Sequence, residues 1–264
     1  MSYYITTFCY GNKYEPILPK WKSTIENRCK NSLIKIFDKC NITLNFGGQY
    51  AWWDVVRMHN NLQILIKENK PIVHVDIDLI IKKDIEPLVN LNYDLIFSRE
   101  IGGDKAFPKE CSKILGFGIC SGFYIVKPTA QKFIMKIYNM MNSHKYGSYS
   151  DQVNIMNYII NNNYIIKDEI IILDGIEYKN NIIQIDNIKI CVLDFNIILR
   201  DPILNVNQFG NHINIDNVGG TQNFLKYFDE DLESLPLTCR CGKTNLGDNN
   251  ICKHVNLRKK CLTP

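Results

Sequence analysis

The segment PIVHVDIDLI, residues 71–80, is the most informative part of this sequence. Its nearly continuous apolar run is typical of a central strand that is covered on both faces. Asp76 and Asp78 lie within it, and in an extended strand their side chains would point to the same face. Since carboxylates are rarely buried without a partner, this pair calls for a positively charged group beside it.

A divalent cation is one such partner. In open α/β sheets, ligands bind beyond the carboxyl ends of the strands. Mg²⁺ and Mn²⁺ suit carboxylate, water and phosphate ligands, so a cation that bridges to a diphosphate would satisfy both carboxylates. Alternatively, the carboxylates cap the following turn or pair with Lys82 or Lys83. The Asp-x-Asp pattern alone leaves both interpretations open.

The sequence on either side of this segment alternates between strand and helix patterns. In the clearest helix, residues 51–69, apolar side chains repeat at helical spacing up to a terminating Pro71. The alternation predicts an α/β fold with a central, mostly parallel sheet. We expect strands at 3–8, 72–77, 93–97 and 118–127, one at 33–37 or 42–46, short Ile-rich strands within 164–193, and further helices at 20–30, 129–141 and 150–161.

The composition is that of an ordinary globular protein. With 264 residues, 45% hydrophobic and 22% charged, the chain is not collagen-like, coiled-coil or wholly disordered. The net charge of +4 gives no argument for a nucleic-acid partner, and we expect none. Lys, Asp or Asn interrupts every long apolar run, and the N-terminus lacks a signal-peptide pattern. We therefore predict no membrane span, a cytoplasmic location and mostly reduced cysteines.

A change of composition near Pro236 divides the chain into a domain of residues 1–235 and a Cys-rich basic tail of residues 236–264. Zn²⁺ could bind the tail cysteines, yet Cys-x-Cys departs from the usual Cys-x-x-Cys knuckle, so we favour a solvated tail. Disulfides are the alternative in an oxidising compartment. The tail contains Cys239, Cys241, Cys252 and Cys261, whereas buried apolar positions are expected for Cys9, Cys29, Cys40, Cys111, Cys120 and Cys191.

The longer segment PIVHVDIDLIIKKDIEPL, residues 71–88, resembles the Asp-x-Asp segment of glycosyltransferases of the GT-A fold. It is similar to nucleotide-diphospho-sugar transferases of the glycogenin-like type. The resemblance implies a Rossmann-like GT-A fold, a UDP-sugar donor and a divalent metal, Mn²⁺ or Mg²⁺. By the same resemblance, Asp76 contacts the ribose and the metal, and Asp78 coordinates the metal.

Three further segments resemble the donor site of that family. In TTFCYGNKY, residues 6–14, the resemblance implies nucleotide contacts from Thr6 and Thr7 and stacking of Tyr14 on uracil. Asp54 and Arg57 resemble an Asp-x-x-Arg element near the diphosphate; the alternative is a plain ion pair within one helix. In CSGFYIVKPT, residues 120–129, the resemblance places Ser121 and Gly122 beside the donor sugar.

Two later segments complete the resemblance. SDQVNIMN, residues 150–157, is similar to a helix start of retaining members and implies that Asp151 and Gln152 are catalytic and face the sugar. The alternative is a helix cap at Ser150 and Asp151. FGNHIN, residues 209–214, supplies His212 as the third metal ligand; the Lys-Pro-Trp that usually follows is missing, which leaves Lys226 as a distant candidate for binding the diphosphate.

The sequence therefore predicts a metal-dependent glycosyltransferase of the hexosyltransferase class. It would move a sugar from a nucleotide-diphosphate donor to an acceptor hydroxyl on a glycan, protein or lipid-linked molecule, and the Asp-Gln pair favours retention. One alternative is a haloacid-dehalogenase-like phosphatase with Asp76 as nucleophile, although that family normally places its Asp pair near the N-terminus. The other alternative is a non-catalytic nucleotide-sugar-binding module, which would be expected to lose metal ligands.

Overall fold

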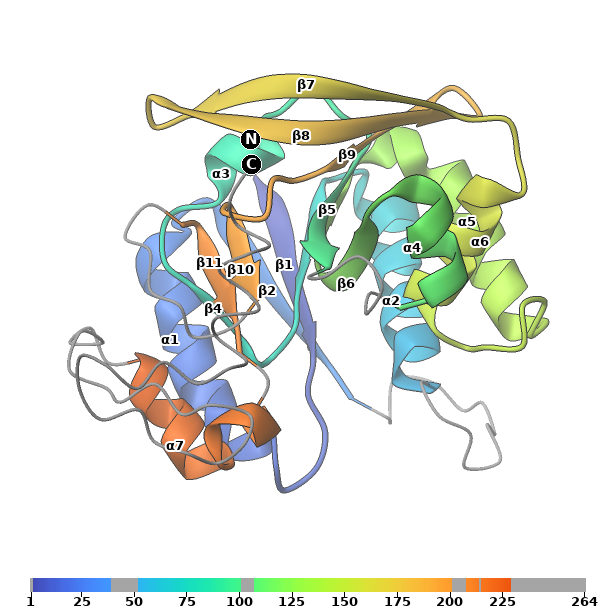
Figure 1. Cartoon of the computed structure of the whole chain (residues 1–264). Coiled ribbons are helices and arrows are strands. Elements are labelled where there is room, and N and C mark those ends of the chain that lie inside the picture. The colour runs from blue at the N-terminus through green and yellow to red at the C-terminus, as the bar shows by residue number, and fades with distance from the viewer. Residues whose placement is uncertain (1, 39–51, 101–106, 201–207, 214, 229–264) are drawn as a thin grey trace, which may run out of the picture.

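The computed structural model describes residues 2–38, 52–100, 107–200, 208–213 and 215–228 (Figure 1). An eight-stranded sheet of order β2-β1-β3-β6-β5-β9-β8-β7 forms its centre. The strands of this sheet are β1 (Tyr3–Phe8), β2 (Ser32–Phe37), β3 (Ile72–Val75), β5 (Leu95–Glu100), β6 (Gly118–Val126), β7 (Ile165–Leu173), β8 (Ile176–Ile185) and β9 (Ile188–Val192).

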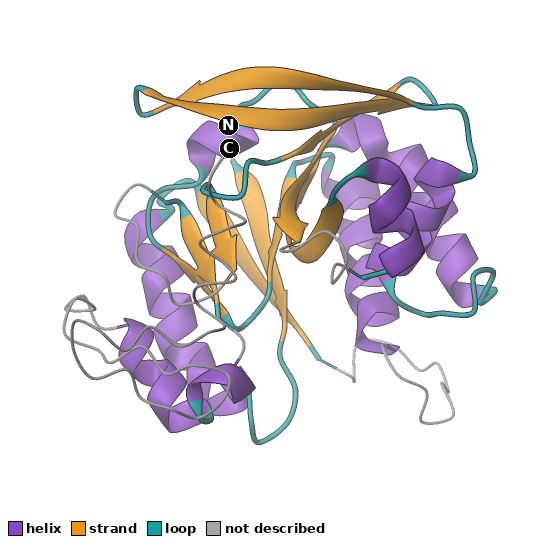
Figure 2. Ribbon diagram, viewed as in Figure 1, coloured by secondary structure: helices purple, strands orange, loops and turns teal. Residues whose placement is uncertain are grey.

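Strand directions confirm the expected mostly parallel sheet. Six of its eight strands run in one direction and only β6 and β8 run in the opposite direction; β2, β1 and β3 are mutually parallel and β5 is parallel to β9. A second, three-stranded sheet has the order β10-β11-β4 and lies beside the first (Figure 2). Its strands are β4 (Leu79–Ile81), β10 (Ile198–Arg200) and β11 (Gly210–His212).

Helices cover both faces of the large sheet, as Figure 1 shows, with α1 on one side and α2, α5 and α6 on the other. The α-helices are α1 (Leu18–Arg28), α2 (Trp52–Glu68), α3 (Glu86–Val89), α4 (Lys109–Leu115), α5 (Gln131–Asn142), α6 (Asp151–Ile160) and α7 (Thr221–Leu225). Short 3-10 turns occupy η1 (Glu15–Ile17), η4 (Pro128–Ala130), η5 (Ile215–Val218) and η6 (Lys226–Phe228).

Two hydrophobic cores follow from this layering. On the α1 face, Trp21 and Ile25 pack with the inward side chains of β1 and β3. On the other face, Val55 and Met58 of α2 pack with side chains of α5, α6 and β6. All four of these side chains are buried, because their helical spacing places them on the sheet-facing side of each helix.

The segment after β3 departs from the sequence expectation. β3 ends at Val75, and residues 76–78 form a turn in which the Leu79 amide donates to the Asp76 carbonyl at 2.9 Å. The expectation that Asp76 and Asp78 share one face of a single extended strand is therefore wrong. Their carboxylates converge because the turn carries the chain from one sheet into the other.

Other differences are smaller. The strand at 33–37 is confirmed, while 42–46 lies outside the described residues. The Ile-rich strands are longer than expected, because β7 and β8 form a hairpin of 9 and 10 residues. The tail of residues 236–264, with its four cysteines, and Cys40 also lie outside the described residues.

Five cysteines in the described part of the chain are free and buried, as expected for small apolar side chains. These are Cys9, Cys29, Cys111, Cys120 and Cys191. Each helix in the described ranges is too short or too polar to cross a membrane.

Candidate metal and donor site

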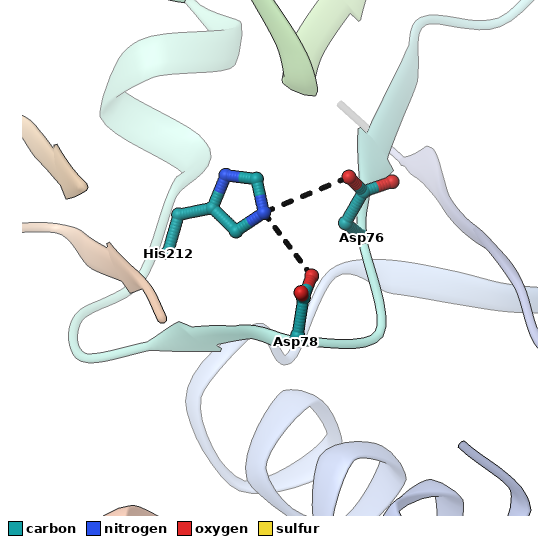
Figure 3. Close-up of side chains that lie close together, drawn as sticks. All are labelled: Asp76, Asp78 and His212. Carbon is teal, nitrogen blue, oxygen red and sulfur yellow. Dashed lines mark hydrogen bonds and ion pairs between the residues drawn. The ribbon is translucent and has the colours of Figure 1, made fainter. Parts of the chain in front are cut away.

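Three candidate metal ligands converge at the junction of the two sheets (Figure 3). The ligand atoms of Asp76, Asp78 and His212 all lie within 4.8 Å of one another. His212 Nε2 is 3.1 Å from Asp78 Oδ1 and 3.7 Å from Asp76 Oδ2. Two carboxylate oxygens and one imidazole nitrogen form a donor set that suits a divalent cation such as Mn²⁺.

Backbone pairing holds these three ligands together. β11 runs antiparallel to β4, and this register places His212 opposite Leu79. The amide of Ile213 donates to the Asp78 carbonyl at 3.0 Å. On the other side, the Asp76 amide donates to the Gly122 carbonyl of β6 at 2.8 Å. The site is therefore built on strands rather than on freely moving loops.

Gly122 forms one wall of the site. A Cβ atom there would lie 2.3 Å from His212 Cε1 and 2.7 Å from Asp76 Oδ2, closer than real Cβ contacts. Any larger residue would push the two ligands apart, so only glycine permits this close approach. The three donor groups and this glycine together fit the divalent metal that the GT-A resemblance implies.

Arg57 lies behind the metal ligands and joins three carboxylates. Its Nη1 donates to Asp76 Oδ1 at 3.0 Å, and its Nη2 lies 2.7 Å from Asp151 Oδ2 and 3.1 Å from Asp54 Oδ1. The same Nη2 donates to Ser121 Oγ at 2.9 Å. The alternative of a plain ion pair within one helix is therefore incomplete. Arg57 does pair with Asp54, but it also connects α2 to the end of β3, to β6 and to α6.

The charges around Arg57 do not balance, because one guanidinium faces three carboxylates. Burial raises the pKa of Asp54 well above its usual value, and the charges of Asp151 and Asp76 add to this rise against the lowering effect of Arg57. Burial also acts to raise the pKa of Asp76, but Arg57 and its histidine neighbours outweigh burial and lower it. Asp76 is therefore an ionised, acceptor-only ligand.

The negative field extends to His212. Burial alone would lower the pKa of its imidazole, but the Asp78 carboxylate reverses this effect and raises the pKa well above its usual value. A field that stabilises a proton on this ring also attracts a divalent cation, since both carry positive charge. The electrostatics of the cluster therefore agree with its ligand chemistry.

The residues predicted to contact the nucleotide differ in their exposure to solvent. Thr6 and Thr7 have no exposed surface, so their contact with a base stays a prediction. Tyr14 is partly buried, and its pKa is raised first by burial and then by the Asp78 charge. The Lys13 ammonium lies 5.3 Å from the centre of the Tyr14 ring and pairs with Asp216 at 2.7 Å.

Asp151 and Gln152 begin α6, as predicted; Asp151 is buried and Gln152 is partly exposed. Asp151 has no exposed surface, and its Oδ1 accepts from the Gln152 amide at 2.6 Å. The Gln152 side chain donates to the carbonyl of Phe107. Ser150 occupies the N-cap position of α6, as the alternative expected, but its side chain makes no capping bond. The catalytic roles of Asp151 and Gln152 stay predictions.

Two neighbours of the ligands were missed by the sequence analysis. His74, treated only as part of the apolar strand, is fully buried and lies 3.0 Å from Asp76 Oδ1 through its Nε2. Cys120 Sγ lies 3.6 Å from His212 Nδ1. The signal for His74 was its place two residues before Asp76 in an otherwise apolar strand. Side chains two residues apart in an extended chain point to the same side.

The lysines considered earlier have other partners. Lys83 pairs with Asp174 at 2.9 Å, so the structure does not support its expected alternative role as the counterion of Asp76 and Asp78. Lys226 donates to Asn223 Oδ1 at 3.2 Å. Binding of a diphosphate by Lys226 stays a prediction.

Comparison with known proteins identifies the fold. No protein-family model and no curated protein matches the sequence. Among solved structures, a glycosyltransferase involved in glycosylation of the major capsid of PBCV-1 is similar with a TM-score of 0.55 and 12% identity, over 89% of this chain and 100% of that chain. The galactosyltransferase LgtC, in complex with donor and acceptor sugar analogs, gives a TM-score of 0.51 and 11% identity, over 96% and 99% of the two chains.

An active-site mutant of LgtC is similar to the same degree, with a TM-score of 0.51 and 12% identity over 88% of this chain and 97% of that chain. Identities this low establish the fold alone. The chain has the GT-A-like glycosyltransferase fold, and the fold expected from the sequence resemblance is confirmed.

Proposed function

We propose that this chain is a metal-dependent glycosyltransferase that moves a sugar from a UDP-sugar to an acceptor hydroxyl. One observation carries the proposal: Asp76, Asp78 and His212 converge on a GT-A-like fold, beyond the end of β3. Ligands of open α/β sheets bind at such carboxyl ends of strands. Mn²⁺ or Mg²⁺ is the metal that the oxygen-rich donor set favours.

The metal supplies Lewis-acid stabilisation of the charge that develops on the leaving diphosphate. Asp76, Asp78 and His212 would hold it. Arg57 fixes Asp76 from behind, so that the ligand does not have to reorganise during transfer. Gly122 lets Asp76 and His212 approach its backbone closely, and Tyr14 offers an aromatic ring for the base.

The sugar-facing side of the site is assigned by resemblance and supported by proximity. Ser121 and Asp151 both bond to Arg57, which places them one side chain away from Asp76. We assign Asp151 and Gln152 to the retaining reaction that the Asp-Gln pair favours. One structural neighbour is a galactosyltransferase, which supports a hexose as the transferred sugar.

The two alternatives receive less support. A haloacid-dehalogenase-like phosphatase needs Asp76 as a free nucleophile, whereas Asp76 Oδ1 accepts bonds from Arg57 and contacts His74. Its fold also differs from the glycosyltransferase structures that this chain resembles. A non-catalytic sugar-nucleotide module remains compatible with the fold, but the chain keeps all three candidate metal ligands.

The decisive experiment is a panel of nucleotide sugars with and without Mn²⁺, scored for released nucleoside diphosphate. We expect Mn²⁺-dependent release from one UDP-sugar, and loss of that release in Asp78→Asn. Hydrolysis of simple phosphate monoesters without nucleotide release would indicate the phosphatase. Tight UDP binding with no release from any sugar, in the presence of a broad acceptor panel, would indicate the binding module.

A further inference from the structure

A buried polar chain runs behind the metal ligands and begins in the first strand. Thr6 of β1 and His74 of β3 are direct partners in the parallel register of these strands. Thr6 Oγ1 lies 3.4 Å from His74 Nδ1, and His74 Nε2 lies 3.0 Å from Asp76 Oδ1. Both Thr6 and His74 have no exposed surface. The chain therefore links a hydroxyl in the sheet interior to one oxygen of a candidate metal ligand.

Packing fixes the plane of the His74 ring. The ring stacks on Tyr124 of β6, with 4.9 Å between the centroids and 28° between the planes. His74 and Tyr124 are register partners, so the strands themselves hold the two rings against each other. Tyr124 is fixed in turn by Asn61 of α2, whose Nδ2 donates to the phenol oxygen at 2.8 Å. The imidazole is therefore a rigid support.

Hydrogen-bond chemistry decides which nitrogen carries the proton. An ionised carboxylate only accepts, so Asp76 Oδ1 at 3.0 Å requires an N–H on His74 Nε2. Nδ1 then accepts from the Thr6 hydroxyl, which has to donate because it is buried. Arg57 Nη1 lies 3.2 Å from His74 Nε2 and 3.0 Å from Asp76 Oδ1, and it donates to the oxygen because a protonated Nε2 cannot accept.

The two oxygens of Asp76 consequently have different surroundings. Oδ1 accepts from His74 and from Arg57. Oδ2 lies 3.7 Å from His212 Nε2, on the side of the other ligands, and 2.7 Å from the position that a Cβ of Gly122 would occupy. One oxygen faces the protein interior and the other faces the metal site.

We propose that His74 is a positioning residue, which with Arg57 holds Oδ1 of Asp76 so that only Oδ2 is presented to a divalent cation. The proposal rests on the metal site of the proposed function. It makes Asp76 a ligand through a single oxygen with a fixed direction. Hydrogen-bond partners of metal ligands act in this way, and their loss typically lowers metal affinity by about 10–100-fold.

Matched variants test this role through Mn²⁺ affinity, measured by the electron paramagnetic resonance of free Mn²⁺. His74→Phe keeps a ring against Tyr124 and removes both nitrogens, and we expect affinity to fall by about 10–100-fold. His74→Gln places an amide nitrogen near the position of Nε2, so most of the affinity should return. His59→Phe, the same change at a histidine bonded to Tyr138, should leave affinity unchanged. Native affinity in a folded His74→Phe variant would overturn the proposal.

A second measurement needs no metal and no turnover. ¹⁵N NMR of the metal-free chain reports the protonation of each imidazole nitrogen, and the His74 signals are assigned by their loss in His74→Gln. We expect a single proton on Nε2, and a changed Nδ1 shift in Thr6→Val. A single proton on Nδ1 would overturn the proposal. If the native chain binds no Mn²⁺, the proposed function fails, while this NMR result still decides the role of His74.

Discussion

Arg57 donates to one and the same oxygen of Asp151 through two nitrogens, with Nε at 3.0 Å and Nη2 at 2.7 Å from Oδ2. Both side chains are buried, with exposed fractions of 4% for Arg57 and 0% for Asp151. Since Arg57 also bonds to Asp76, the start of α6 is connected to the metal ligands through one guanidinium. Asp151 thus acts on the site through Arg57 in this structure.

This pair predicts a large stability effect for Asp151→Asn. The change removes the carboxylate charge from two hydrogen bonds of the buried Arg57 guanidinium, and hydrogen bonds to charged groups contribute about 1.5–3 kcal/mol. Asp54 and Asp76 still balance the Arg57 charge. The interpretation as a helix cap predicts only about 0.3–1 kcal/mol. Urea unfolding measures the difference. Asp174→Asn, which breaks the exposed pair with Lys83, is the control and should cost at most about 1 kcal/mol. If Asp151→Asn lowers the free energy of unfolding by an equally small amount, Asp151 acts only as a helix cap.

Metal dependence is tested at Asp78. Excess EDTA should abolish nucleotide-sugar turnover, and Mn²⁺ should restore it, because the ligands then bind the cation again. Asp78→Asn should lose turnover and Mn²⁺ binding while its circular dichroism stays native, since the backbone bond from Ile213 to residue 78 does not need the side chain. Asp168→Asn, at a surface position, is the matched control. Normal turnover in folded Asp78→Asn would contradict the metal site.

Gly122→Ala should close the metal site. The added methyl would lie 2.3 Å from His212 Cε1, so His212 or Asp76 has to move out of its ligand position. We expect Mn²⁺ affinity, measured by isothermal titration calorimetry, to fall at least about tenfold. Gly147→Ala adds the same methyl where no atom lies within 4 Å, although its φ of +68° introduces backbone strain. That control should lose some stability and keep native Mn²⁺ affinity.

Donor binding is tested with UDP. UDP together with Mn²⁺ should raise the melting temperature, because a ligand that binds only the folded state stabilises it. Tyr14→Ala should lower UDP affinity by about 1–3 kcal/mol, the range for loss of an aromatic ring that stacks on a base. Tyr93→Phe, which removes only a hydroxyl bonded to Glu169 at a different part of the fold, is the control. If no nucleoside diphosphate shifts the melting temperature, the donor-site assignment is wrong.

Local patterns predicted the elements of the fold well. The apolar run before Asp76 became β3, and the helical repeat through Val55 and Leu62 became the buried face of α2. Local patterns cannot predict a change of sheet. The turn at residues 76–78 depends on pairing of β4 with β11, more than a hundred residues later in the chain, so a strand reaching Ile77 was the natural expectation.

The ligands of the site were easier to predict than their supports. Asp76, Asp78 and His212 carry side chains whose chemistry indicates a metal, and the resemblance to GT-A glycosyltransferases gives their order. The contacts of Arg57 with Asp151 and Ser121 join residues 94 and 64 positions apart. No spacing in a single sequence reports such contacts, because they depend on how α2, α6 and β6 pack in three dimensions.

The separation of the ligands along the chain has a consequence for protein synthesis. His212 and Asp78 are 134 positions apart, and β11 pairs with β4 only when both have formed. The ribosome synthesises residues 76–78 long before residue 212, so the growing chain contains two of the three candidate ligands without the third. We expect a ribosome-bound chain arrested before residue 208 to bind Mn²⁺ only weakly. A complete set of candidate ligands therefore requires that β11, with His212, has been synthesised and has paired with β4.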